Sequence, residues 1–283
     1  MRTIAYLGPE HTNAHLAALA TFGRQPRYAH EPTVDDVFSL VERDRADYGV
    51  VPIENSLEGA VTHTLDRFID FKDTPVKIVG EIEFHIQHYF ITKAGVRPSE
   101  VQTVYSHPQA LAQCRKWITA HLPKQHWLME TSSTSEAVER VARESVPASM
   151  TKKAKHLAAI GSREAAHTHG LSALPIRDER ENKTRFLVIG KHEPPKRRRS
   201  KTSILLALKD RPGALYDALT PFKRERINLT KIESRPSKRR AWEYYFFIDL
   251  EGHRSEPRVK RALKALERST SLLRVLGSYP TAK

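Results

Sequence analysis

The sequence predicts an α/β domain followed by a smaller α+β domain of ferredoxin-like βαββαβ order. In roughly the first 190 residues, apolar strand-like segments alternate with amphipathic helix-like segments, which favours a sheet covered by helices on both faces. In the remaining residues the order is strand, helix, strand, strand, helix, strand. Charge divides the chain at the same place. From Pro194 onward there are 23 Lys and Arg against 9 Asp and Glu, whereas the first 193 residues carry 24 of each.

The elements of the first region each have a local signal. The helix expected at 12–23 has Thr12 or Asn13 as a possible cap and Gly23 as a terminator. Pro108 stands at the first position of another helix, where its missing N–H costs nothing. In chain order, we expect a strand at 2–8, helices at 12–23 and 33–44, a strand at 47–53, two strands within 76–93, a strand at 101–107, helices at 108–122 and 131–144, a strand and then a helix within 157–170, and a strand at 184–190.

The second region is expected to begin after a basic, Pro-containing linker at 191–200. The run KRRRS in this linker could contact nucleic acid, but an interdomain tether is the favoured interpretation, so no nucleic-acid partner is predicted. Strands are expected at 202–209, 227–236, 241–252 and 272–279, and helices at 211–225 and 255–270.

Several classes of protein are disfavoured by the composition. The longest apolar runs are far shorter than a membrane span, and the N-terminus lacks the apolar region of a signal peptide. Cys114 is the single cysteine, so no internal disulfide forms and a cytoplasmic protein is expected, without a membrane partner. The sequence has no H-E-x-x-H, Cys-x-x-Cys, G-x-G-x-x-G, P-loop or G-x-S-x-G pattern. We therefore expect a site without a metal or a cofactor.

Polar loops that follow strands and start helices are the candidate site, because ligands of α/β sheets bind at the carboxyl ends of strands. Glu54, Asn55 and Ser56 follow one strand, Ser106 and His107 precede Pro108, and 131–135 is rich in hydroxyls. Each set could instead cap a helix. For Glu54, Asn55 and Ser56, composition slightly favours capping. For His107, capping is the commoner role of such a histidine. For 131–135, the sequence does not separate helix capping from ligand binding.

Six segments in this order resemble the prephenate dehydratase family: GPEHT, VPIENSLEGAVTHTLD, SHPQALAQC, TSSTSEA, AAIGSREAA and NKTRFLVIG. RPGALYDAL and ESRP resemble the effector-binding segments of its ACT domain. The resemblance implies a catalytic domain at 1–190 built from two lobes like a type II periplasmic binding protein, and an ACT domain at 201–283. The first lobe would comprise about 1–75 with 165–190, and the second 76–164. The chorismate mutase domain fused in some members is not seen, so a monofunctional enzyme is expected.

The resemblance implies that prephenate loses carbon dioxide and water to give phenylpyruvate, without a cofactor. Thr184 would donate a proton or hydrogen bond to the leaving hydroxyl. Because a free Thr hydroxyl is a poor acid, a neighbour must polarise it, and Arg185 is the local candidate; it could equally pair with a substrate carboxylate. Asn55, Ser106 and Gln113 would orient the substrate. Further substrate-binding positions are Thr12, Ser56, Phe186, Ser132, Ser133 and Thr134, with Phe186 either near the ring or merely anchoring its strand.

The first loop departs from the family pattern. Members commonly carry Gly-Thr-Phe-Ser where this chain has His11, Thr12, Asn13 and Ala14. The missing aromatic leaves arogenate, the aminated analogue of prephenate, as an alternative substrate. A non-enzymatic protein that binds a small anion is a second alternative.

The ACT resemblance also implies an allosteric site for L-phenylalanine at a domain interface. A glycine at the start of a helix lets a ligand approach its N–H groups, although simple turn geometry explains Gly213 equally well. The implied effector residues are Gly213, Ala214, Leu215, Asn228, Glu233, Ser234, Arg235 and Pro236. Because ACT domains commonly pair side by side, a homodimer or tetramer is expected.

Overall fold

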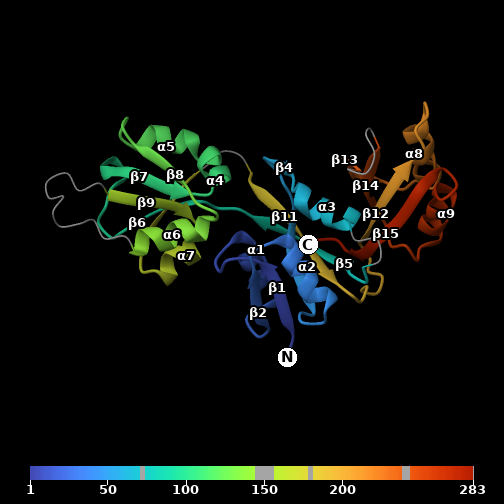
Figure 1. Ribbon diagram of the computed structural model, residues 1–283, viewed down its shortest axis with the longest axis horizontal. Coiled ribbons are helices and arrows are strands. Elements are labelled where there is room, and N and C mark those ends of the chain that lie inside the picture. Colours follow the sequence, from blue (N-terminus) through green and yellow to red (C-terminus); the bar gives the residue numbers. More distant parts are fainter. Residues whose placement is uncertain (71–73, 144–155, 178–180, 238–242, 283) are drawn as a thin grey trace.

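The computed structural model describes residues 1–70, 74–143, 156–177, 181–237 and 243–282. Figure 1 shows three bodies along the longest axis of the molecule, with the first lobe in the middle, the second lobe at one end and the C-terminal domain at the other. The ends of two expected elements, residue 144 and residues 241–242, lie outside the described residues. No helix in the described ranges is long and apolar enough to cross a membrane.

The first lobe is a mixed sheet in the order β2-β1-β3-β11-β5, with β4 paired to β3. β1 is parallel to β2 and β3, whereas β11 is antiparallel to β3 and β5. α1 packs on one face, and α2 and α3 pack on the other. The elements are β1 (Thr3–Leu7), α1 (Asn13–Phe22), β2 (Arg27–Glu31), α2 (Val34–Glu42), β3 (Tyr48–Asn55), β4 (Gly59–Ala60), α3 (Thr62–Asp70), β5 (Lys77–His85) and β11 (Lys183–Gly190).

The second lobe is a five-stranded sheet in the order β10-β6-β9-β7-β8. β7, β8 and β9 are parallel, so the helices that follow them, α4, α6 and α7, all begin at the same edge of this sheet. The elements are β6 (Tyr89–Thr92), the 3-10 turn Pro98–Glu100, β7 (Val101–Ser106), α4 (Pro108–Gln113), α5 (Arg115–His121), β8 (Trp127–Glu130), α6 (Thr134–Arg143), β9 (His156–Gly161), α7 (Arg163–Thr168) and β10 (Ser172–Pro175).

The expected lobe boundaries were wrong at both crossings. The expected second lobe begins at residue 76, but β5 pairs with β11 in the first sheet. The expected first lobe includes residues 165–190, but α7 and β10 belong to the second lobe. The two crossover segments lie side by side. The Ile86 N–H donates to the Asn182 carbonyl (2.8 Å), and the Ile176 N–H donates to the His88 carbonyl (2.9 Å). Strand periodicity alone does not tell which sheet a strand joins.

The C-terminal domain has the expected βαββαβ order and an antiparallel sheet in the order β13-β14-β12-β15. α8 and α9 pack on one face of this sheet. The elements are β12 (Ser200–Leu208), α8 (Ala214–Arg224), β13 (Leu229–Pro236), β14 (Tyr244–Glu251), α9 (Pro257–Leu266) and β15 (Thr270–Pro280).

The other face of the C-terminal sheet packs against the first lobe. Phe68 and Ile78 of the first lobe share one buried core with Phe247 and Leu276. At Gly277 the backbones of β15 and β5 approach so closely that an added Cβ would lie 2.0 Å from the Ile78 carbonyl oxygen. The two domains are therefore packed together through a continuous apolar core.

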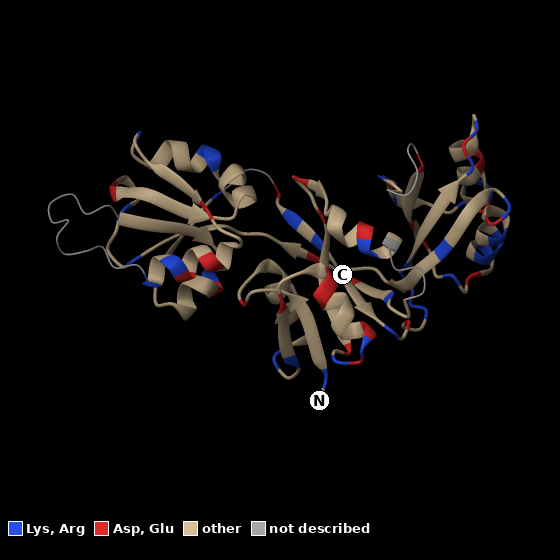
Figure 2. Cartoon of the chain, viewed as in Figure 1, with Lys and Arg blue, Asp and Glu red and all other residues tan. Residues whose placement is uncertain are grey.

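Part of the basic surplus lies on the outer helices of the C-terminal domain. Figure 2 shows Lys and Arg gathered around α9. Lys260, Arg261, Lys264 and Arg268 are exposed, and Arg261 forms an ion pair with Glu225 at 2.6 Å. This is a solvated helical face on the side of the sheet away from the first lobe.

Candidate active site

Strand alternation divides the residues around Thr184 between the two faces of the first-lobe sheet. Thr184 is directly opposite Asn55 in the antiparallel pair of β11 and β3, and Arg185 is directly opposite Glu54. Because successive side chains of a strand point to opposite faces, Thr184 and Asn55 share one face, and Arg185 and Glu54 share the other.

The Asn55 amide fixes the direction of the hydrogen bond to Thr184. Its Oδ1 accepts from the backbone N–H groups of Leu57 (2.9 Å) and Glu58 (3.2 Å), which can only donate. Its Nδ2 therefore donates to Thr184 Oγ1 at 3.0 Å, and also to Asn182 Oδ1 at 2.8 Å. Thr184 Oγ1 accepts this bond, so its own hydrogen is left to donate elsewhere. Asn55, and not Arg185, is the neighbour that polarises the hydroxyl.

The polar chain continues from Asn55 to the second lobe. Asn182 Nδ2 donates to Gln113 Oε1 at 2.9 Å, and His88 Nε2 lies 2.8 Å from the same oxygen. Gln113 Nε2 reaches Glu58 of the first lobe at 3.4 Å. The chain thus connects the end of β3, both crossovers and the last residue of α4. Asn55, Gln113 and Thr184 are brought together as expected.

The catalytic role expected for Arg185 is not supported by its position. Its side chain is buried on the face toward the C-terminal domain, where its guanidinium pairs with Glu54 (2.6 Å), Glu81 (3.1 Å) and Asp249 (2.8 Å). Lys231 pairs with Glu54, and Lys201 pairs with Glu81 at 3.0 Å. Alternation makes Thr184 and Arg185 diverge although they are adjacent. The guanidinium is bound to carboxylates of the protein and joins the two domains.

Burial and charge compete in this ionic cluster. Burial alone would raise the pKa of Glu54, but Arg185 and Lys231 beside it hold the pKa below its usual range. Burial likewise opposes the charge of Arg185, yet Asp249, Tyr279 and Glu54 raise its pKa above the usual value. Both groups are therefore charged at neutral pH, and each depends on the other for its stability.

Ser106 and Phe186 are not available to a substrate. Ser106 is fully buried, and its hydroxyl donates to the Ile160 carbonyl at 2.7 Å. Phe186 is 2% exposed and packs with Ile4 and Tyr6 in the core under α1. Instead of contacting a substrate, the Ser106 hydroxyl joins β7 to β9, and Phe186 anchors β11 in the core.

Most of the other candidate hydroxyls cap helices or fasten loops. Thr12 caps α1, and Ser133 Oγ accepts from the Glu136 N–H at 3.1 Å at the start of α6. Ser132 Oγ donates to the Glu136 carboxylate. Ser56 Oγ donates to the Glu181 carbonyl (3.0 Å) and accepts from the Lys183 N–H (2.9 Å). At the first residue of α6, the Thr134 hydroxyl makes no hydrogen bond to a described residue.

His107 is a helix cap in the structure. Its Nδ1 accepts from the Gln109 N–H at 3.3 Å, and burial lowers its pKa while Glu130 opposes this. A ring nitrogen that holds a backbone N–H is engaged with the helix, so the capping interpretation applies to His107 rather than general base catalysis.

The altered first loop is held by a second histidine. His11 has a φ of 64°, a conformation that favours the glycine typical of the family at this position. Its N–H donates to His15 Nδ1 at 2.9 Å, and Ser162 Oγ of the second lobe donates to its carbonyl at 3.1 Å. Burial, with His11 and His30 adding to it and Glu10 opposing, lowers the pKa of His15. Neutral His15 keeps the lone pair that this bond requires.

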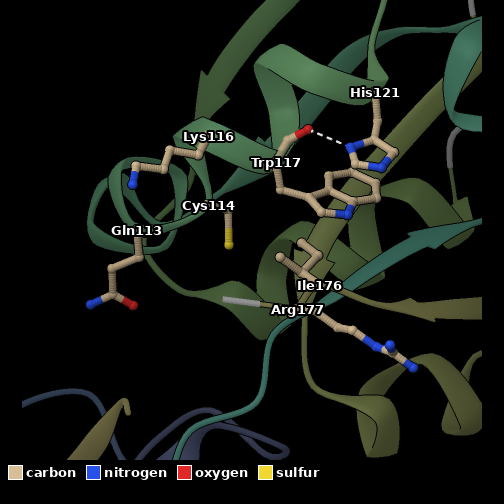
Figure 3. Close-up of a pocket in the computed structure, with 7 residues that line it drawn as sticks. All are labelled: Gln113, Cys114, Lys116, Trp117, His121, Ile176 and Arg177. Carbon is tan, nitrogen blue, oxygen red and sulfur yellow. Dashed lines mark hydrogen bonds between the residues drawn. The ribbon is translucent and has the colours of Figure 1, made fainter. Parts of the chain in front are cut away.

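A cavity of about 270 Å³ opens beside α4 and α5. Figure 3 shows Gln113 at its edge with the amide directed away from Trp117, whose ring lies face to face with His121 at 4.3 Å. Lys116 and Arg177 supply positive charge to the wall, and the Cys114 side chain is part of the same wall. Gln113 is therefore shared between the polar chain and this cavity.

The expected effector residues are divided between the two ends of the C-terminal domain. Gly213, in the left-handed conformation (φ 78°), begins α8, and Asn228 follows the other end of this helix. Eleven residues of helix separate them, a length of roughly 16 Å. Arg235 forms ion pairs with Asp66 of α3, and Asn228 donates to Glu251 at 3.2 Å. A single chain does not bring Gly213 and Asn228 together.

Two residues of the polar chain were missed by the sequence analysis. Asn182 is two positions before Thr184, and the i, i+2 spacing of a strand was a usable signal that the two side chains share a face. His88 has no local signal, because it lies at the crossing between the lobes. In the described part of the chain, no three His, Cys, Asp or Glu side chains gather where they could hold a metal ion.

Comparisons with known proteins place these features in a family. A family model for prephenate dehydratase matches residues 4–194, and one for the ACT domain matches residues 202–268. The bifunctional chorismate mutase/prephenate dehydratase of Aquifex aeolicus is 48% identical over 281 residues, which is 99% of this chain and 74% of that relative. The solved structure of a prephenate dehydratase from Arthrobacter aurescens in complex with L-Phe is 31% identical, with a TM-score of 0.85 over 98% of this chain and 90% of that one. GqqA, described as a novel type of quorum quenching acylases, is 27% identical, with a TM-score of 0.83 over 99% of this chain and 98% of that one.

Proposed function

The chain belongs to the prephenate dehydratase family, and on this premise we propose that it converts prephenate to phenylpyruvate in L-phenylalanine biosynthesis. In this reaction the ring carboxylate leaves as carbon dioxide and its bonding electron pair enters the ring. The ring hydroxyl takes up one proton and leaves as water. Because the ring becomes aromatic, the protein has to hold the substrate and assist one leaving group.

The observation that carries the proposal is the direction of the bond between Asn55 and Thr184. Since Asn55 Nδ2 donates to Thr184 Oγ1 at 3.0 Å, the Thr184 hydrogen is available to the leaving hydroxyl. A hydroxyl that accepts a hydrogen bond becomes a better donor. Gln113, tied to Asn55 through Asn182, supplies an amide from the second lobe for orienting the substrate.

The likeness to the acylase GqqA raises amide hydrolysis as a competing reaction. A Thr nucleophile needs a base in contact with its hydroxyl. Among the described residues, the side chain bonded to the Thr184 hydroxyl is the amide of Asn55, which is not a base. The geometry favours a Thr184 that donates a hydrogen bond over a Thr184 that attacks.

The proposal includes allosteric regulation by L-phenylalanine through the ACT domain of a homodimer. The solved relative that contains L-Phe and the match to the ACT family support this. β13 is an edge strand with Ile232 47% exposed. Two chains joined antiparallel along β13 would bring Gly213 of one copy to the same end as Asn228 of the other. Such a dimer would complete an effector site that one chain leaves divided.

The test is turnover of prephenate, followed as phenylpyruvate, with and without L-phenylalanine. Thr184→Val should lower kcat by about 10²- to 10⁴-fold, the range for loss of a positioned proton donor, while substrate binding measured by calorimetry is retained. Thr168→Val, at an exposed position of α7, is the matched control and should keep full activity. A wild-type protein that binds prephenate without turnover would instead support the anion-binding alternative, and faster turnover of arogenate would identify that substrate.

A further inference from the structure

We propose that His88 is a positioning residue for this reaction, acting through the amide of Gln113. The inference rests on the proposed function, because Gln113 matters to catalysis only if the polar chain holds the substrate. The observation is that Gln113 Oε1 lies between two groups, His88 Nε2 at 2.8 Å and Asn182 Nδ2 at 2.9 Å.

The direction of each bond in the chain follows from the backbone. Because the Leu57 and Glu58 N–H groups hold Asn55 Oδ1, Asn55 donates through Nδ2 to Asn182 Oδ1. Asn182 must then present its Nδ2 to Gln113 Oε1. An oxygen that already accepts one hydrogen bond can take His88 only as a second donor. His88 therefore carries a hydrogen on Nε2.

This arrangement sets which end of the Gln113 amide faces the first lobe. With Oε1 held by two donors, Nε2 is turned toward Glu58, 3.4 Å away. The backbone N–H of Glu58 is itself bonded to Asn55 Oδ1, so Glu58 connects the donor end of Gln113 to the residue that polarises Thr184. Without His88, one bond to Asn182 would remain, and the amide could rotate to present its oxygen to the substrate.

His88 and Asn182 come from different crossovers, whereas Gln113 is the last residue of α4 in the second lobe. Asn182 directly precedes β11 of the first lobe, whereas His88 directly precedes β6 of the second lobe. The bond from Asn182 therefore links Gln113 to the first lobe, and His88 holds the same oxygen from the side of the second lobe.

The first test removes and restores the donor. His88→Leu should lower kcat/KM about tenfold, the effect expected for one lost hydrogen bond of this kind. His88→Gln, which can place an amide N–H near the position of Nε2, should recover most of the activity. His85→Leu, three residues earlier and exposed, is the control and should match the wild type. Equal activity of His88→Leu and wild type would overturn the proposal.

A double-mutant cycle then separates positioning from a purely structural role. If His88 acts through Gln113, His88→Leu should cause no further loss of kcat/KM when added to Gln113→Leu. Additive losses would show that His88 acts by another route and would contradict the proposal.

The third measurement does not depend on activity. Long-range ¹H–¹⁵N NMR of the wild-type protein should find His88 with its hydrogen on Nε2, and this signature should weaken in Gln113→Leu. A neutral His88 with the hydrogen on Nδ1 would overturn the inference. Because this readout needs no substrate, a correct His88 tautomer in a protein without dehydratase activity would refute the proposed function alone.

Discussion

At the scale of single residues, the site depends on amide groups whose direction is set by the backbone. A threonine hydroxyl is a weak acid, and the sequence suggested the adjacent guanidinium of Arg185 as its partner. The structure instead places Asn55 Nδ2 against Thr184 Oγ1 and directs Arg185 to the opposite face. The Asn55 amide can donate only because its oxygen is held by two backbone N–H groups of the following loop.

Asn55→Asp should test this directly, because it keeps the shape and changes a donor into an acceptor. The new carboxylate oxygen would face Asn182 Oδ1 and Thr184 Oγ1, and Thr184 would turn its hydrogen toward the carboxylate. We expect kcat to fall by about 10- to 100-fold, the cost of losing a donor among buried acceptors. Gln125→Glu, the same chemical change at an exposed position, should have no effect. An active Asn55→Asp enzyme would mean that Asn55 does not polarise Thr184.

At the scale of elements, capping and periodicity correctly predicted the helices with clear signals. α1 has Thr12 as its cap and ends at Gly23 with φ 74°, both as expected. The helix expected at 108–122 is two helices, α4 and α5, that meet at Cys114. α3 was missed, although Leu65, Phe68 and Ile69 have the i, i+3, i+4 spacing of a buried helical face. β2 and β8 were missed because edge strands need no continuous apolar run, and β8 is exposed throughout.

The contact between β15 and β5 should depend on the absence of a side chain at Gly277. Gly277→Ala would place a Cβ 2.0 Å from the Ile78 carbonyl oxygen, a backbone atom that cannot move without shifting β5. We expect a loss of about 3 kcal/mol or more in the free energy of unfolding, because the two domains must separate locally. Urea denaturation of Gly277→Ala and of the wild type measures this difference in the free energy of unfolding.

Gly80→Ala provides the comparison for this change. Gly80 lies on β5, the strand that contains Ile78, and its added Cβ would meet Val188 at an ordinary contact distance of 3.4 Å. If Gly277→Ala were no less stable than Gly80→Ala, close approach of the two backbones would not be needed for domain packing.

At the scale of the whole molecule, the ionic cluster around Arg185 joins the catalytic strands to the C-terminal domain. Arg185 follows Thr184 in sequence, and Glu54 precedes Asn55. Besides pairing with each other, Arg185 pairs with Asp249 of β14 and Glu54 pairs with Lys231 of β13. Lys231 is two residues before Glu233 of the proposed effector segment. The face of the strands opposite the active site is thus the face that contacts the regulatory domain.

Arg185→Met should lower the free energy of unfolding by about 3 to 5 kcal/mol, because it leaves the buried carboxylates of Glu81 and Asp249 with fewer cations. Adding Asp249→Asn removes one of these charges and should recover part of the loss. Turnover per folded molecule should fall far less than in Thr184→Val. A stable but inactive Arg185→Met would instead restore the catalytic role that the sequence suggested.

The sequence by itself determined the order of the elements, the two-domain division and the motifs that place the chain in its family. These depend on local signals: the caps of helices, the alternation of strands and the spacing of short polar motifs. Only the tertiary structure decided which candidate residues act together. The lobe boundaries, the roles of Ser106 and Arg185, and the participation of Asn182 and His88 depend on which strand lies beside which and which face each side chain occupies. The physical reason is that hydrogen bonds and ion pairs form between neighbours in space, and residues 55, 88, 113 and 184 become neighbours only when the chain crosses twice between its lobes.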